Sequence, residues 1–281
     1  MKTGIVDVGG GMRGIYARGV MDYCMEYGIS FDLGIGVSAG AANICTFLAG
    51  QKGRNYKFYT DYNHRKESMS LSNLIKKGSY IDMDYIYGTL SNADGECPFD
   101  FDALLKNPTE LLVVAENAIT GETKYFTKDY ITQDNLDIVK ASCSIPYVNK
   151  PYYVDGEPYF DGALGDPVPV EKAISMGCDK VVLILSKPRD VLRLPKRDIA
   201  IAKRIKKEYP VSAERISGRA DRYNAELETA KKLEAEGKVL ILAPDDTCGV
   251  DTLTKEKEPL DKLYQKGLKD AEKIPPFLGL S

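Results

Sequence analysis

Five short stretches of the chain are apolar throughout, instead of alternating between apolar and polar residues. Helix-length patterns separate many of them. Runs of this kind are typical of strands that are covered on both faces, as in a parallel sheet that lies between helices. The pattern therefore predicts an α/β fold, a three-layer α/β/α sandwich with a mostly parallel central sheet. The predicted strands are residues 3–8, 31–37, 110–118, 180–186 and 238–244.

Two stretches depart from this alternation. Residues 51–109 are polar and broken, with many Tyr, Asn and Ser residues, which favours a cap-like insertion of short helices. Residues 195–237 form a strongly charged helical pattern that ends at Gly237, before the last predicted strand. Because no internal repeat or low-complexity linker interrupts the chain, we expect residues 1–281 to form a single domain.

Composition narrows the classes of protein to consider. The 281 residues are 43% hydrophobic and 28% charged, and a formal net charge of −3 gives no reason to expect nucleic acid as a partner. The six cysteines are scattered without a C-x-x-C pair, so neither a zinc site nor a disulfide framework is expected. The amino terminus lacks a signal-peptide pattern, and no apolar run is long enough for a membrane span. We expect a cytoplasmic protein without a metal or cofactor.

The first predicted strand runs into a glycine-rich loop. Gly9, Gly11 and Gly14 have the G-x-G-x-x-G spacing of a dinucleotide-binding turn between a strand and a helix. Backbone N–H groups and a helix amino terminus in this setting face an anion. The anion could be a bound pyrophosphate or another negative charge.

A second motif lies where the next strand ends and a helix begins. Residues 36–40 read G-x-S-x-G, and in this position the motif is typical of a nucleophile elbow with Ser38 as the nucleophile. The alternative is a glycine-rich turn whose serine caps the helix. Ser142, Cys143 and Ser144 are other possible nucleophiles, but no glycine elbow surrounds them, so we expect them to pack or cap near Pro146.

A nucleophilic serine needs a general base, and the chain offers only one histidine for this role. The only histidine, His64, lies in the polar region soon after Ser38, where we expect a surface position. A carboxylate within hydrogen-bond reach is therefore the better candidate for the base. Asp155 with Gly156 suits a hairpin turn. Asp161 comes at the far end of the returning strand and is our candidate, the alternative being a second turn aspartate.

Four segments together resemble the patatin-like phospholipase family, and its bacterial members most closely. They occur in the family's order over the first 170 residues or so, which makes the combination more specific than any one of them. The resemblance implies a Ser-Asp dyad without histidine, and a lipid acyl hydrolase whose substrate is a lipid or another acyl ester. The segments are GGGMRG (9–14), GVSAGA (36–41), ASCSIP (141–146) and YFDGALGDPVPV (159–170).

Carried over by position, the resemblance assigns roles to individual residues. Ser38 would be the nucleophile and Asp161 the general base, within the motif of Asp161, Gly162 and Ala163. The glycine loop would be the oxyanion hole, with N–H groups near Gly10 and Gly11 and support from Arg13. The full loop is Gly9, Gly10, Gly11, Met12, Arg13 and Gly14, and the elbow is Gly36, Val37, Ser38, Ala39 and Gly40.

The chain departs from the family pattern at three places. Val8 stands directly before the glycines where many relatives have aspartate, and Asp7 precedes it. Ala163 replaces a glycine. Asp166 adds a carboxylate near Asp161, which would either raise the pKa of Asp161 or form a local hydrogen bond.

Two surfaces are candidates for lipid contact. The tyrosines between residues 56 and 87, with Met69 and Met83, would either line a cap over a lipid or form the core of that region. Basic residues alternate with isoleucines in 196–207, which would be either a solvated helix face or a site of peripheral contact with an anionic membrane.

Two other classes of function remain at this stage. A nucleotide-dependent enzyme would use the glycine loop, with Asp32 as the ribose ligand, but it leaves Ser38 and Asp161 unexplained. A non-catalytic lipid-binding protein would keep the same scaffold. Covalent labelling of Ser38 separates the second class from a hydrolase.

Overall fold

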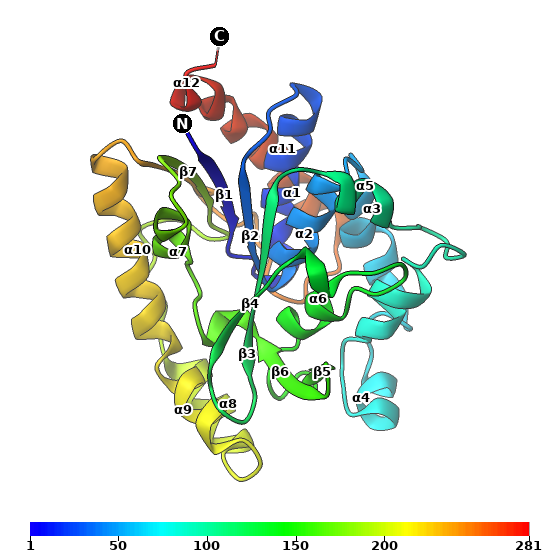
Figure 1. Cartoon of the computed structure of the whole chain (residues 1–281). Helices are drawn as coiled ribbons and strands as arrows, with labels where there is room; N and C mark the ends of the chain where they lie inside the picture. Colours follow the sequence, from blue (N-terminus) through cyan, green and yellow to red (C-terminus); the bar gives the residue numbers. More distant parts are fainter. Residues whose placement is uncertain (281) are drawn as a thin grey trace.

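The computed structural model describes residues 1–280, and in this part of the chain eight strands form one sheet (Figure 1). The strand order is β5-β6-β3-β2-β1-β7-β8, and β4 also pairs with β3. The strands are β1 (Thr3–Asp7), β2 (Leu33–Val37), β3 (Glu110–Asn117), β4 (Thr123–Phe126), β5 (Tyr152–Val154), β6 (Glu157–Asp161), β7 (Lys180–Ile184) and β8 (Val239–Leu242).

The five strands that the apolar runs predict are all present, and they pair in parallel with one another as β3, β2, β1, β7 and β8. The prediction of a mostly parallel sheet is confirmed. The sequence pattern missed β4, whose residues are only half-buried apart from Phe126. The predicted hairpin is present, since β5 and β6 pair antiparallel. Asp155 and Gly156 form its turn, and both have the positive φ angles that such a turn requires, 50° and 81°.

Helices cover both faces of the sheet. The α-helices are α1 (Ile15–Glu26), α2 (Ala39–Leu48), α3 (Arg54–Thr60), α4 (Leu71–Lys77), α5 (Phe101–Lys106), α6 (Asp137–Ser142), α7 (Val170–Ser175), α8 (Lys196–Ile205), α9 (Pro210–Ser217), α10 (Arg219–Ala235), α11 (Lys257–Asp270) and α12 (Ile274–Leu278). Shorter helical turns are η1 (Gly11–Gly14), η2 (Tyr62–His64), the π-helical η3 (Tyr85–Thr89), η4 (Lys128–Tyr130), η5 (Gly162–Leu164) and η6 (Ala271–Lys273).

The sheet separates two hydrophobic cores. Figure 1 shows α1, α2 and α11 on one side of the sheet and α7 and α10 on the other. Successive residues of a strand point to opposite faces, so Ile5 and Val182 enter the first core, whereas Val6 and Val181 enter the second. The chain is therefore the three-layer α/β/α sandwich that its sequence predicts. In residues 1–280, no helix has both the length and the apolar character needed to cross a bilayer.

The loop after β1 packs directly on the turn after β2, and glycines make this contact possible. A Cβ atom on Gly9 would lie 2.2 Å from the carbonyl oxygen of Val37, and one on Gly40 would lie 2.3 Å from that of Asp7. Gly9 also has a φ of 67°, which side chains other than glycine rarely adopt. The two turns are thus held backbone against backbone.

This contact predicts an unequal effect of two similar substitutions. Gly9→Ala should lower the free energy of unfolding by more than about 2 kcal/mol, because a left-handed residue with a Cβ costs about 1 to 2 kcal/mol before any clash is added. Gly28→Ala is the control, since Gly28 has nearly the same φ, 66°, but no atom within 4 Å of its added Cβ. Urea denaturation measures both variants. Equal destabilisation would contradict the packing contact.

Candidate active site

Ser38 occupies a strained turn between β2 and α2. Its φ of 56° and ψ of −131° are unusual for a residue with a side chain, and only 7% of the residue is exposed. A Cβ on Gly36 would lie 2.4 Å from the Cα of Ala41, and the space at Gly40 is equally closed. The two glycines therefore let the chain reverse sharply at Ser38, which is the geometry of a nucleophile elbow.

Pairing with β3 brings Asp161 to Ser38. Val114 pairs with Val37 of β2 on one side and with β4 on the other. The next residue, Ala115, pairs with Asp161 of β6 and again with β4. Because β4 occupies one edge of β3, β2 and β6 share the opposite edge and meet end to end. Ser38 and Asp161 stand at these two facing ends.

The Asp161 carboxyl group is buried and only 2% of the residue is exposed. Burial raises the pKa of Asp161 above its ordinary value. The neighbouring Ser38 side chain and the Ala163 amide offset part of this rise, and the positive charges of Arg219 and Arg193 add to the offset. The Ala163 N–H donates to Oδ1 of Asp161 over 2.9 Å. A desolvated carboxylate beside a serine hydroxyl can accept its proton once the two groups come within hydrogen-bond distance.

The carboxyl end of α6 and the residues just after it support both residues, a role that the sequence patterns did not reveal. The Oγ atom of Ser142 accepts a hydrogen bond from the Ser38 N–H at 2.8 Å. The carbonyl oxygen of Ser144 accepts one from the Asp161 N–H at 2.9 Å. We expected these serines to pack or cap near Pro146. The family resemblance of residues 141–146 (ASCSIP) was the signal that could have suggested this role, because it linked the segment to the motifs that contain Ser38 and Asp161.

Two amides of the glycine loop are free to bind an anion. The Gly9 N–H donates to the Asp7 carboxylate, and the Met12 N–H donates to the carbonyl oxygen of Thr252. The amides of Gly10 and Gly11 have no acceptor within residues 1–280. Gly10 has a φ of 122° and Gly11 a φ of 61°, so this arrangement requires glycine at both positions.

Buried polar contacts fix the loop relative to α2. Asp7 accepts hydrogen bonds from the Gly9 amide and from the side chain of Asn43, which also binds the carbonyl oxygen of Gly14. Burial raises the pKa of Asp7 to about 6, although its two hydrogen bonds act in the opposite direction. Asp7 thus holds the glycine loop from two residues before Gly9.

Arg13 lies behind the loop and contacts a later part of the chain. Its Nη1 is 2.9 Å from Asp251 and 3.2 Å from the hydroxyl of Thr252, and the residue is 8% exposed. An Nη2 atom of Arg13 also lies 3.5 Å from where a Cβ of Gly10 would be. Its positive charge is therefore close to the free amides, while the guanidinium group itself is held by the 251–252 segment.

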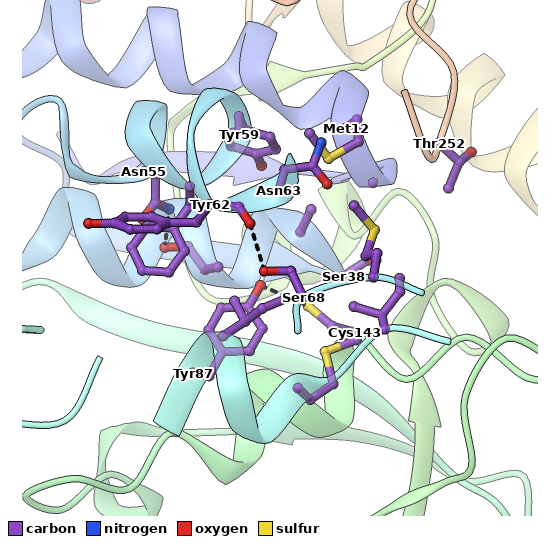
Figure 2. Close-up of a pocket in the computed structure, with 18 of the residues that line it drawn as sticks. Met12, Ser38, Asn55, Tyr59, Tyr62, Asn63, Ser68, Tyr87, Cys143 and Thr252 are labelled. Carbon is purple, nitrogen blue, oxygen red and sulfur yellow. Dashed lines mark hydrogen bonds between the residues drawn. The ribbon is translucent and has the colours of Figure 1, made fainter. Parts of the chain in front are cut away.

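A cavity of about 110 Å³ opens beside Ser38. Figure 2 shows Ser38, Met12, Tyr59, Tyr87 and Cys143 around it. Most of the wall comes from residues 54–87, and Met69 and Met83 belong to it. Tyr59, Tyr62 and Tyr87, with the two methionines, therefore line a space next to the serine, which is one of the two alternatives for this region, whereas its other tyrosines do not. They also pack on the adjoining core.

Three other polar residues lie away from this centre. His64 is exposed and does not line the cavity. Asp166 accepts a hydrogen bond from the hydroxyl of Tyr125, which is the local alternative considered for it. Asp32 precedes β2, where it binds Thr3 at the amino end of the sheet. Asp32 therefore lies at the end of the sheet opposite to the glycine loop, which does not fit its suggested role as a ribose ligand.

Known proteins resemble the chain in sequence and in fold. An uncharacterized protein of Escherichia coli K12, YjjU, is 28% identical over 199 residues, which are 69% of this chain and 54% of YjjU. The chain thus spans about half the length of this curated relative. The crystal structure of VipD from Legionella pneumophila superposes with a TM-score of 0.51 at 16% identity, covering 97% of this chain and 66% of VipD. This likeness concerns the fold.

Two family models match separate parts of the chain. A model described as a domain of unknown function (DUF6363) matches residues 209–276, which contain α10, β8 and α11. A model described as patatin-like phospholipase matches residues 8–174, which contain the glycine loop, Ser38 and Asp161. This second match spans more than half of the chain. The chain therefore belongs to the patatin-like phospholipase family.

Proposed function

We propose that this protein is a serine hydrolase that cleaves acyl ester bonds of lipids, of phospholipid or lysophospholipid type, through an acyl-Ser38 intermediate. The observation that carries the proposal is the buried contact between Ser38 and Asp161 beside an apolar cavity. Membership of a lipid acyl hydrolase family supports it. The loop that carries the free amides of Gly10 and Gly11 packs through Gly9 against the turn that carries Ser38.

The proposed reaction has two halves. Asp161 accepts the hydroxyl proton of Ser38 while Oγ bonds to the ester carbonyl carbon, and the carbonyl electron pair moves onto the oxygen. The amides of Gly10 and Gly11 donate to this oxyanion. The intermediate expels the alcohol, which takes the proton from Asp161, and leaves an acyl group on Ser38. Water then attacks in the same manner, and the carboxylic acid departs as Ser38 regains its proton.

The cavity supports a fatty acyl chain as the substrate's apolar part. Met69, Met83 and Ile86 present flexible or branched aliphatic surface, and Tyr59 and Tyr87 add aromatic surface. Methionine adapts to chains of different shape. Each methylene buried in such a wall contributes about 0.8 kcal/mol, so an acyl chain of several carbons supplies substantial binding energy.

Removal of either member of the pair tests the chemistry. Ser38→Ala and Asp161→Asn should each lower kcat/KM for p-nitrophenyl butyrate by at least about a thousandfold, because nucleophile and base act as a unit. Far-UV circular dichroism checks that both variants fold. A fluorophosphonate probe should label the wild-type protein and fail to label Ser38→Ala. Equal labelling of the two, or wild-type rates in both variants, would favour a non-catalytic lipid-binding protein.

The pH dependence of the reaction follows from the environment of Asp161. The base must be ionised, and burial raises its pKa, so kcat/KM should fall as the pH drops through a value above the ordinary aspartate pKa of about 3.9. Activity should be complete above that value. Rates are read at the isosbestic wavelength of p-nitrophenol. Asp7 also has a raised pKa, about 6, so Asp7→Asn is the control. An inflection that disappears in Asp7→Asn would contradict the assignment to Asp161.

Narrowing the cavity should change the preferred chain length. Ala42 of α2 lines the cavity, and Ala42→Val adds two methyl carbons to the wall. The ratio of kcat/KM for p-nitrophenyl octanoate to that for the acetate should fall about tenfold, which is typical for one methylene of misfit in an apolar pocket. The acetate serves as the internal control. An unchanged ratio would mean that the acyl chain lies elsewhere.

A further inference from the structure

The cap region exposes aliphatic side chains beside the cavity. Helix α4 leaves the wall between Met69 and Ile81, which face each other in an isolated β-bridge and both line the cavity. On α4 itself, Leu71 is 69% exposed and Ile75 is 85% exposed, and Leu74 is 39% exposed. Large aliphatic side chains exposed to this extent and gathered on one short helix point to an interaction surface.

A second exposed apolar group lies before and within α8. Val191, Leu192 and Leu194 are 51%, 59% and 76% exposed, and Ile199 follows at 42%. The opposite side of α8 is buried through Ala202 and Ile205. This element therefore presents apolar side chains outward as well as inward.

Contacts join the two groups around the cavity. Arg204 of α8 stacks on the ring of Tyr147 at 4.7 Å, and Tyr147 follows Ile145, a cavity residue, by two positions. The next residue, Val148, accepts a hydrogen bond from the amide of Tyr80, just beyond α4. At the other end of α8, Arg197 is 3.7 Å from Asp251, which precedes the cavity residue Thr252.

Figure 1 shows α4 and α8 at the same end of the molecule, with the β5–β6 hairpin between them. We call α4, Tyr147 and residues 191–207 together the docking rim. The carboxyl ends of β1 and β2, which carry the glycine loop and Ser38, point toward this end of the sheet. The docking rim thus lies at the end of the sheet that carries Ser38, and its contacts reach the sequence neighbours of the cavity residues Ile145 and Thr252.

The docking rim is strongly basic in a chain whose net charge is −3. Residues 191–207 contain seven cations and one acid, Asp198, which is buried and bound by Arg193 and Arg219. Of the acids that face it from neighbouring positions, Asp190 pairs with Lys231, and Asp251 pairs with Arg13 and Arg197. Glu208 adds one exposed negative charge. The cations are Arg193, Lys196, Arg197, Lys203, Arg204, Lys206 and Lys207.

We propose that the docking rim binds the surface of an anionic phospholipid bilayer and seats the cavity entrance on it. Aliphatic side chains of α4 and of 191–194 enter the interface, and the lysines and arginines of α8 contact anionic headgroups. Lysine is depleted at protein–protein interfaces, and α8 with its last turn carries Lys196, Lys203, Lys206 and Lys207. This composition favours a membrane over a second protein. The lipid-hydrolase role rests on the proposed function, whereas binding to the bilayer is measured without it.

Sedimentation with vesicles tests the docking rim. All proteins carry Ser38→Ala, so no lipid is consumed, and the vesicles are phosphatidylcholine alone or phosphatidylcholine with phosphatidylglycerol. One variant is Lys203→Gln with Lys206→Gln and Lys207→Gln, and a second is Leu192→Ser with Leu194→Ser. The matched control removes three exposed lysines from other helices, Lys57, Lys232 and Lys269, with the same change in net charge.

The parent protein should bind the anionic vesicles and not the neutral ones. Loss of three surface cations should weaken this binding roughly a hundredfold, while the control stays within about twofold of the parent. The leucine variant should also bind more weakly. With Ser38 restored, every variant should hydrolyse p-nitrophenyl acetate at the parent rate, which shows that the proteins are folded.

Several results would overturn the proposal. One is equal binding of the parent protein to neutral and anionic vesicles, and another is an equal loss of binding in the lysine control variant. A third is a dimer in light scattering that the leucine variant abolishes, because a second copy of the chain would then cover the docking rim. Binding without any ester hydrolysis by the Ser38 protein would leave the docking rim intact and refute the proposed function instead.

Discussion

The end-to-end meeting of β2 and β6 along one edge of β3 is the constraint on which the site depends. Each strand is short, and neither would bring Ser38 or Asp161 anywhere in particular by itself. Register on β3 does so, because Val37 pairs with Val114 and Asp161 pairs with the adjoining Ala115. A shift of one residue would turn each side chain to the opposite face of the sheet and separate the pair.

Around this junction, closely packed backbone segments exclude solvent from Ser38 and Asp161. Gly9 and Gly40 let two turns touch without side chains between them, and Asp7 binds the amide of Gly9. Ser142 and Ser144 accept hydrogen bonds from the backbone N–H groups of Ser38 and Asp161. Because the carboxyl group of Asp161 is cut off from solvent, its pKa rises, and the amide of Ala163 and the neighbouring Ser38 side chain offset part of that rise. The buried amides of Ser38 and Asp161 thus keep hydrogen-bond partners although solvent is excluded from them.

The carboxyl-terminal third completes this arrangement from outside the catalytic motifs. α10 covers one face of the sheet, β8 extends the parallel ladder beside β7, and α11 packs on the other face. The same third also reaches the site, since Asp251 holds Arg13 and the Thr252 carbonyl holds the amide of Met12. Its basic helix α8 contacts Tyr147 and Asp251, which lie close in sequence to the cavity residues Ile145 and Thr252. A region without recognisable catalytic motifs thus influences how the glycine loop is held.

The sequence by itself determined the layers, because strands buried on both faces must be apolar at every position, and Asp155-Gly156 predicted its hairpin through turn chemistry. It also determined which residue types were available for catalysis, since Ser38 had a glycine elbow and His64 lay in a polar stretch. Only the tertiary structure decided that Ser142 binds the amide of Ser38, that Asp166 turns to Tyr125, and that Arg13 pairs with Asp251. Such partners lie up to 238 residues apart, and no local periodicity records a contact that sheet register and loop packing create.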